Sequence, residues 1–364
     1  MIFAKQLLSS HLDKLWLYPT HDMFRLLRHL LFFLNDEKAY RLLLTCVSLM
    51  GRTTILRPFT KLLYKKSDPS LERTVFGLKF RNPVGMAAGI DVSAKYSRHL
   101  SDMGFGFIEI GSVTPLPQKG NPSPRLFRLP KDKAVIARMG NNNDGVKAVI
   151  DNLKKKSPSA IIAANITKNA ASEGDKIVKD FGYCFSMLYD FVDMFVVNIS
   201  CSFADGKQPD ISYLSEILDE ILDTRMTLDI YKPVLLKISP DIGHSQIDEI
   251  LNYAQLSGID GIVVGGSTLS RENLATSPKK LESIGEGRLS GAPLFKKNLE
   301  LVRYINEKTK GRLPIVGCGG IMTPENASEM LKAGASLVEV CTGLLYSGPS
   351  LVKKINKHLI SENA

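Results

Sequence analysis

The sequence contains little that would build a metal centre, a disulfide framework or a membrane span. Its five cysteines (Cys46, Cys184, Cys201, Cys318 and Cys341) form no C-x-x-C pair and no metal-ligand spacing. We therefore expect reduced thiols, as in a protein that faces the cytosol. No apolar stretch approaches the ~20 residues that a spanning helix needs. The first residues lack the charged region, apolar run and cleavage site of a signal peptide.

Acidic residues are the scarcer charged type. The chain has 47 Lys and Arg against 37 Asp and Glu, a net charge of +10 over 364 residues. Such a surplus suits nucleic acid, a membrane surface or anionic substrates. The basic residues are dispersed and have no interleaved aromatic motif, so nucleic acid is the weaker interpretation. The length and the 44% hydrophobic content suit one large α/β domain with a small appendage.

Residues 1–65 differ in pattern from the rest of the chain. The stretches 24–34 and 39–50 each combine apolar faces with basic residues, and the Asn-Asp-Glu between them is typical of a turn and N-cap. Two interpretations are open at this point. One is a helical hairpin packed on the main domain, and the other is a hairpin on a membrane surface, where bulky apolar and basic residues suit the headgroup boundary. A polar stretch at 65–70 indicates the boundary with a second domain, 66–364.

The second domain alternates strand-like runs with helical stretches. The eight runs lie at 84–88, 107–110, 161–165, 194–198, 234–238, 261–265, 313–317 and 336–340. Largely apolar runs joined by helices indicate parallel strands buried on both faces. Eight units over roughly 290 residues predict an α/β fold of the (β/α)8 TIM-barrel type, whose active site lies at the carboxyl ends of the strands.

The stretch from Asn198 to Phe203 is the most informative part of the chain. It places an amide, a hydroxyl and a thiol directly after a buried run, which suggests a reaction centre. Cys201 is a candidate general base, because a thiolate accepts protons when its pKa is tuned. A free cysteine is more often a small buried hydrophobe. Its place in a polar loop after a strand argues against that alternative here.

Polar side chains also end three neighbouring strands, at Asn165, Asn198 and Lys237. A lysine there cannot stay charged and unpaired. It either forms a structural ion pair or faces an electron-rich cofactor edge, where it would stabilise the anion of a reduced flavin. The asparagines either cap the following loops or bind a heterocycle. Together the three polar ends favour a ring-shaped polar ligand.

Glycines follow the last two runs, in Gly319-Gly320 and Thr342-Gly343. Loops at these two positions of a barrel commonly bind phosphate through backbone N–H groups. The alternative is that these glycines only close tight turns. Their position after strands seven and eight favours a phosphate site.

In this order, the strand ends resemble the class 2 dihydroorotate dehydrogenase family, which is membrane-associated and uses quinone. The resemblance covers nearly the whole chain and rests on residues 82–89, 104–118, 120–130, 138–143, 237–241, 289–291 and 313–320. It implies an FMN-dependent oxidoreductase that takes a hydride from a substrate C–H while a base removes the neighbouring proton. The product has a C=C conjugated with a carbonyl, and a quinone then reoxidises the flavin.

The resemblance also implies roles for individual residues. Cys201 and Lys237 would be catalytic, and Arg128 would lie at the inner end of a quinone tunnel formed by the N-terminal hairpin. That favours the membrane-surface interpretation of the hairpin, on the cytoplasmic face of a bacterial-like cell membrane. Substrate contacts are expected at Asn141, Asn198, Phe203 and Ser267. FMN contacts are expected at Ala87, Ala88, Gly89, Gly111, Ser112, Asn165, Asn198, Lys237, Ser290, Gly291, Gly319, Gly320, Cys341 and Thr342.

Several substrate positions depart from the family's pattern. Val92 stands where the family has a lysine, and Ala137, Phe203 and Gly266 stand where it has asparagines. Each lost hydrogen bond to a charged or polar ligand costs ~1.5–3 kcal/mol. The lining therefore predicts an altered, less polar substrate. Dihydroorotate itself and a non-catalytic flavin-binding protein of the membrane surface are the alternatives, although a scaffold without activity needs neither the lysine nor the cysteine.

Overall fold

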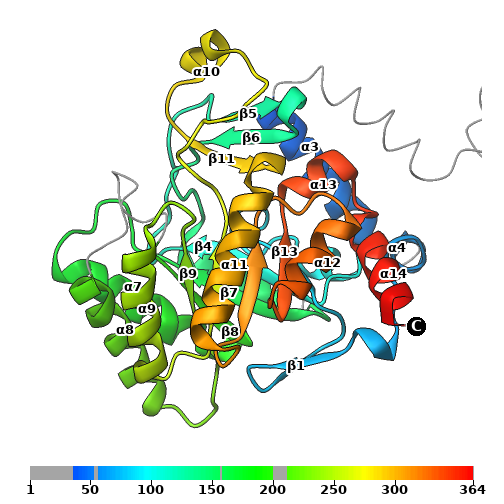
Figure 1. Ribbon diagram of the computed structural model, residues 1–364. Helices are drawn as coiled ribbons and strands as arrows, with labels where there is room; N and C mark the ends of the chain where they lie inside the picture. The colour runs from blue at the N-terminus through cyan, green and yellow to red at the C-terminus, as the bar shows by residue number, and fades with distance from the viewer. Residues whose placement is uncertain (1–35, 53–55, 156–157, 200–210, 364) are drawn as a thin grey trace, which may run out of the picture.

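Eight parallel strands close into a barrel in the computed structural model, which describes residues 36–52, 56–155, 158–199 and 211–363 (Figure 1). All eight predicted runs form these strands, and neighbouring strands follow chain order, as in a (β/α)8 barrel. The fold prediction is therefore confirmed. The strands are β3 (Val84–Met86), β4 (Phe107–Val113), β7 (Ile161–Ile166), β8 (Met194–Asn198), β9 (Val234–Ile238), β10 (Gly261–Gly265), β12 (Ile315–Cys318) and β13 (Leu337–Val340).

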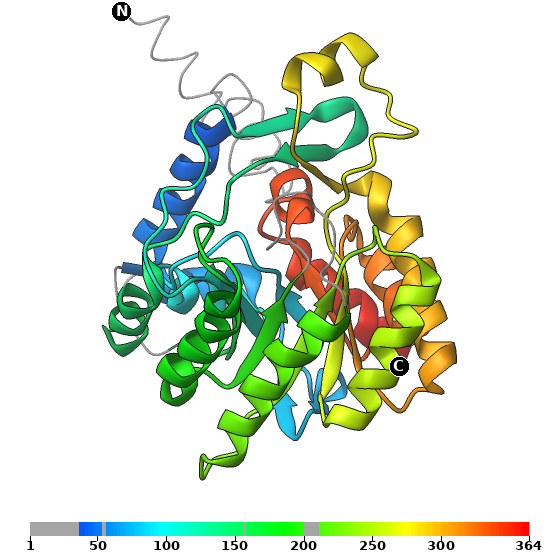
Figure 2. The ribbon, with the colours of Figure 1, turned by 90° about the vertical axis from the view of Figure 1, so that its left-hand side faces the viewer.

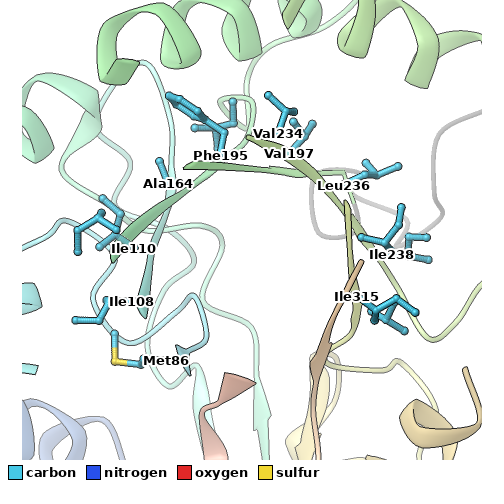
Figure 3. Packing of buried hydrophobic residues seen from close by; sticks show 14 of the residues in the cluster. Met86, Ile108, Ile110, Ala164, Phe195, Val197, Val234, Leu236, Ile238 and Ile315 are labelled. Carbon is cyan, nitrogen blue, oxygen red and sulfur yellow. The ribbon is translucent and has the colours of Figure 1, made fainter. Parts of the chain in front are cut away.

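Helices surround the barrel and cover the outer face of its strands (Figures 1 and 2). Because side chains alternate along a strand, Ile108 and Ile110 of β4 pack outward while Phe107 and Glu109 point inward. Figure 3 shows this outer cluster, to which Phe195 also belongs. The helices are α5 (Ser97–Ser101), α6 (Gly145–Lys155), α7 (Asp175–Leu188), α8 (Ile211–Met226), α9 (His244–Ser257), α11 (Phe295–Thr309), α12 (Pro324–Lys332), α13 (Thr342–Ser347) and α14 (Leu351–Asn363), with short 3-10 turns at Pro69–Leu71, Pro130–Asp132, Tyr189–Phe191 and Ala292–Leu294.

Apolar side chains fill the amino-terminal half of the barrel interior. Phe107, Leu235 and Leu337 belong to this inner cluster. A hairpin of β1 (Arg73–Val75) and β2 (Leu78–Phe80) closes that end, and the Phe80 ring packs edge-on against Phe107 with 5.5 Å between ring centroids. Any polar chemistry is thereby confined to the other end of the barrel, at the carboxyl ends of the strands.

A small antiparallel sheet lies beyond the carboxyl ends of the strands, together with α10 (Pro278–Ile284) (Figure 1). It joins β5 (Leu126–Leu129), β6 (Ala134–Ala137) and β11 (Arg288–Gly291), with β6 in the middle. Arg128, Val135 and Ser290 form one row across it, and Ala137 pairs with Arg288 two residues further along. The sequence did not predict this sheet, because its strands are short and two of them carry arginines.

The N-terminal segment supplies two described helices, α3 (Asp36–Arg52) and α4 (Leu56–Tyr64). The predicted helix at 39–50 lies within α3, the one at 24–34 lies outside the described residues, and α4 was not predicted. Arg57 of α4 donates to Asp102 at 2.5 Å, and Lys353 of α14 donates to the carbonyls of Leu62 and Leu63. These contacts hold α4 against the barrel domain. Within the described residues, no helix is both long and apolar enough to cross a membrane.

Candidate active site

A chain of hydrogen bonds links the polar ends of four barrel strands. Lys237 Nζ lies 2.8 Å from Glu109 Oε2 and 3.1 Å from Oε1. Asn165 donates to Glu109 Oε1 at 2.6 Å, and Asn198 donates to Asn165 Oδ1 at 3.1 Å and to Ser112 Oγ at 3.2 Å. The three predicted polar ends therefore form one network, and neither asparagine amide is used in these contacts to cap its own loop.

Burial makes this network electrostatically strong. Glu109 is fully buried and Lys237 is 7% exposed. Burial alone would raise the pKa of Glu109, but the Lys237 ammonium and the hydrogen bonds outweigh it and lower that pKa. Burial would likewise lower the pKa of Lys237, and the Glu109 carboxylate raises it instead. Lys237 thus stays charged through the ion pair that the sequence offered as one alternative, while keeping its place beside Asn165 and Asn198.

The loop after β3 is tied to the same network. The Ala88 N–H donates to Glu109 Oε2 at 2.9 Å, and the Gly89 N–H donates to the Gly111 carbonyl at 2.8 Å. Gly111 has φ +106°, which favours glycine. The predicted cofactor residues of the first two loops, which include Ala87, therefore lie next to one another at the barrel mouth.

The end of β11 and the loop after β13 lie side by side at the mouth. Ser290 and Thr342 lie 2.9 Å apart between their hydroxyl oxygens, although 52 residues separate them in the chain. A Cβ added at Gly320 would lie 2.4 Å from the Phe295 nitrogen, so only glycine fits that approach. By contrast, a Cβ at Gly89 would meet no atom within 4 Å, and the same holds at Gly266.

This combination fits a flavin mononucleotide. Open space at Gly89 and Gly266 leaves room for a planar ring over the polar layer. The glycine and hydroxyl loops after β11, β12 and β13 have the composition of a phosphate site. Cys341 adjoins them and is partly buried; burial raises its pKa to about 11, so it is a neutral thiol at pH 7.

The N-terminal helix α3 reaches the same mouth. Arg128, the predicted quinone residue, forms an ion pair with Asp36, which also accepts from the Arg128 N–H at 2.7 Å. One turn later, the Tyr40 hydroxyl donates to the carbonyls of Gly89 and Ile90, at 3.1 and 2.8 Å. The start of α3 therefore lies directly on the loop that carries the predicted cofactor contacts.

The predicted substrate side contains an arginine that sequence reasoning missed. Arg288 donates to Ser267 Oγ at 3.1 Å, to Ser239 Oγ at 3.2 Å and to Asp241 at 3.1 Å. The Ser267 hydroxyl thus already accepts a hydrogen bond from the guanidinium of Arg288 on β11. Asn141 has φ +49°, and its carbonyl accepts from the Gln118 amide. Cys201 and Phe203 lie outside the described residues, so their roles stay predictions.

Comparison with known proteins identifies the family. The dihydroorotate dehydrogenase family model matches residues 70–362. The chain belongs to that family. A curated relative from Christiangramia forsetii, named dihydroorotate dehydrogenase (quinone), is 44% identical over 310 residues, which cover 84% of this chain and 88% of the relative. A relative of the same name from Acinetobacter baumannii is 38% identical over 340 residues, which cover 91% of this chain and 98% of the relative.

Solved structures agree with this assignment. DHODH from Eimeria tenella in complex with ferulenol matches with a TM-score of 0.75 and 29% identity, over 85% of this chain and 89% of that one. The ligand-free form of the same protein matches with a TM-score of 0.75 and 30% identity, over 83% of this chain and 91% of that one. Members of this family are FMN oxidoreductases that act on CH–CH groups, and the predicted fold, enzyme class and cofactor agree with this result.

Two further buried residues escaped the sequence analysis. Glu109 and Glu339 each lie inside a run that was read as apolar, and both point into the barrel. The sequence does contain a signal for them, namely a glutamate inside an otherwise apolar strand. A buried carboxyl group needs either a positively charged partner or a proton. Only the structure places both of them beside Lys237.

Proposed function

We propose that the protein is an FMN-dependent, quinone-linked dehydrogenase that desaturates a C–C bond beside a carbonyl group, on a substrate less polar than dihydroorotate. The observation that carries the substrate choice is the lining of the site. Val92, Ala137 and Gly266 offer no side-chain hydrogen bond where the family has a lysine and two asparagines. A site without those partners does not compensate the desolvation of a charged, donor-rich ligand.

Bound FMN would supply a hydride acceptor. Asn165, Asn198 and Lys237 would bind its ring edge, because they form the polar layer below the open space at the mouth. The loops that carry Ser290 and Thr342 would hold its phosphate. Cys201 would take the substrate proton at its sulfur, since it follows shortly after Asn198 at the end of β8.

Dihydroorotate itself is the second candidate. The curated relatives named dihydroorotate dehydrogenase (quinone) favour it, at 38% and 44% identity. Arg288 also favours it, because it brings a guanidinium close to Ser267 and so supplies positive charge that an anionic substrate would need. Its partner Asp241 offsets that charge, at 3.1 Å.

Anaerobic reduction of the bound flavin separates the two candidates. The purified holoprotein is mixed either with dihydroorotate or with the dihydropyrimidine that lacks the carboxylate, and the loss of the visible flavin absorbance is followed. We expect no rapid bleaching of the flavin when dihydroorotate is added to the unmodified protein. In the double variant Val92→Lys/Ala137→Asn, dihydroorotate should bleach the flavin faster than it does in the unmodified protein. Rapid bleaching of the unmodified protein by dihydroorotate would establish the second candidate, and a protein purified without flavin would overturn both.

The acceptor would be a quinone that arrives from a membrane surface. Helices α3 and α4 expose Leu49, Phe59, Leu62 and other large apolar side chains. Such a face with flanking basic residues suits the interfacial region of a bilayer. Arg128, held by Asp36 of α3, would lie at the inner end of the path from that surface to the flavin. The cytoplasmic face of the membrane would be the site of docking.

A further inference from the structure

A second carboxyl group lies beside the Lys237–Glu109 pair. Glu339 of β13 is 1% exposed, and its Oε2 is 3.8 Å from Lys237 Nζ. Glu109 accepts from Lys237, from the Asn165 amide and from the Ala88 N–H. Among the described residues, Oε2 of Glu339 accepts no hydrogen bond. The two carboxyl groups therefore differ sharply in how well a negative charge on them is stabilised.

The net charge of the cluster also favours only one ionised carboxyl group. One ammonium balances one carboxylate, so a second carboxylate would leave an uncompensated negative charge in the barrel interior. The other titratable side chains close to this cluster are Cys318, whose strand position pairs with Glu339, and Cys341. Burial raises the pKa of both thiols. The Cys318 thiol hydrogen-bonds Glu339 and so favours its charged form, but neither thiol carries a positive charge that could balance a second carboxylate.

We propose that Glu339 is a neutral carboxylic acid that donates its proton in a hydrogen bond to Glu109, and that this proton keeps the layer beneath the flavin electrically neutral. Glu109 and Glu339 form a side-chain hydrogen bond, and a proton on Glu339 supplies the donor that this bond needs, because two carboxylates offer acceptors only. Burial, and next the Glu109 carboxylate, raise the pKa of Glu339 well above its usual range, which agrees with this placement.

The protonated acid has a consequence for the flavin. A flavin that accepts a hydride gains negative charge, and a neutral layer opposes this less than an anionic one would. Glu339 is therefore a positioning residue, because it acts through Glu109 and Lys237 rather than on the substrate. The inference rests on the proposed flavin site, but not on the identity of the substrate or the acceptor.

Infrared spectroscopy of the holoprotein in neutral buffer tests the proposal directly. A buried protonated carboxylic acid has a carbonyl band separate from those of carboxylates. We expect that band in the unmodified protein and its loss in Glu339→Gln. It should also be lost in Glu109→Gln, although Glu339 is still present, because Glu339 then ionises to pair with Lys237. Absence of the band from the unmodified protein, or its persistence in Glu339→Gln, would overturn the proposal.

The flavin midpoint potential gives a second measurement. Glutamine is close in shape to a protonated glutamate and equally neutral, so Glu339→Gln should leave the potential unchanged at neutral pH. The exposed Glu300→Gln on α11 serves as the control. A clear rise of the potential in Glu339→Gln would mean that an anion had been removed, and the proposal would then be wrong. Neither measurement needs substrate, so a failed substrate assignment leaves both of them interpretable.

Discussion

Lys237 of β9 and Glu109 of β4 meet inside the barrel, with 2.8 Å between Nζ and Oε2, from strands separated by two others in the barrel order. Neither could be buried there alone. The pair lets a barrel interior that is apolar at one end carry a charged layer at the other. Asn165 and Asn198 are held in place by hydrogen bonds that begin at this pair.

The first prediction concerns this ion pair. Lys237→Met should lower the free energy of unfolding by about 3–5 kcal/mol, because it leaves a buried carboxylate without its cation. Lys237→Met combined with Glu109→Gln should cost less than the sum of the two single variants. Chemical denaturation of flavin-free protein measures this without a contribution from cofactor binding. Strict additivity would show that the two side chains do not depend on each other.

The second prediction concerns the pH dependence of stability. Unfolded Glu339 ionises near its ordinary value of 4.5, whereas the folded state raises its pKa and retains the proton. Stability from this group is therefore fully present below pH 4.5 and is lost as pH rises towards the folded pKa. Glu339→Gln removes that loss, so the variant should be more stable than the unmodified protein at pH 7 and equally stable at low pH. Denaturation midpoints measured across pH check this, with Glu300→Gln as the control. If the midpoint curves of the unmodified protein and of Glu339→Gln stayed parallel at all pH values, the prediction would be wrong.

The third prediction concerns the proton acceptor. Cys201→Ala should bind FMN normally but reduce it with substrate at least about 100-fold more slowly, which is the usual contribution of a general base. Stopped-flow reduction under anaerobic conditions measures this step. Cys46→Ala, on the exposed side of α3, is the matched control. Unchanged reduction in Cys201→Ala would exclude that cysteine as the base.

The fourth prediction concerns the apolar face of α4. Phe59→Ser/Leu62→Ser should weaken binding to phospholipid vesicles by at least about tenfold, since each buried apolar side chain contributes ~1.5–3 kcal/mol. Met226→Ser/Leu256→Ser is the control, because these residues are even more exposed than Phe59 and Leu62 but lie on α8 and α9. Co-sedimentation of the full chain with vesicles distinguishes the two pairs. An equal loss of vesicle binding in both double variants would mean that the total exposed apolar surface, and not α4, governs binding.

The sequence predicted the barrel well because its strands are locally encoded. Each run from 84–88 to 336–340 is short and largely apolar, and the order of strands follows from chain order once the connections are helical. It predicted Asn165, Asn198 and Lys237 for the same reason, since the carboxyl ends of parallel strands meet. The helix α4 was missed because it has only nine residues and contains Pro58, and the antiparallel sheet was missed because its strands are short and two of them carry arginines.

The partners of the site residues could not be predicted from the sequence. Glu109 and Lys237 are 128 residues apart, and nothing local indicates that they pair. Arg288 is similar, since its contacts with Ser239 and Ser267 depend on the fold of β11 over the mouth. Such pairings are set by the closure of the barrel and by the loss of water, which are properties of the assembled structure.

The row of Arg128, Val135 and Ser290 across the small antiparallel sheet fixes a distance. Strands lie about 4.8 Å apart, so the backbones of Arg128 and Ser290 are roughly 10 Å apart and cannot drift independently. Ala137 and Arg288 pair two residues further along the same strands, on the side where the substrate is proposed to bind. With Arg128 and Ser290 in their proposed roles, a ladder of main-chain hydrogen bonds outside the barrel would set the spacing between the electron acceptor and the cofactor. Side chains of the substrate pocket could then change while the path of the electrons kept its length.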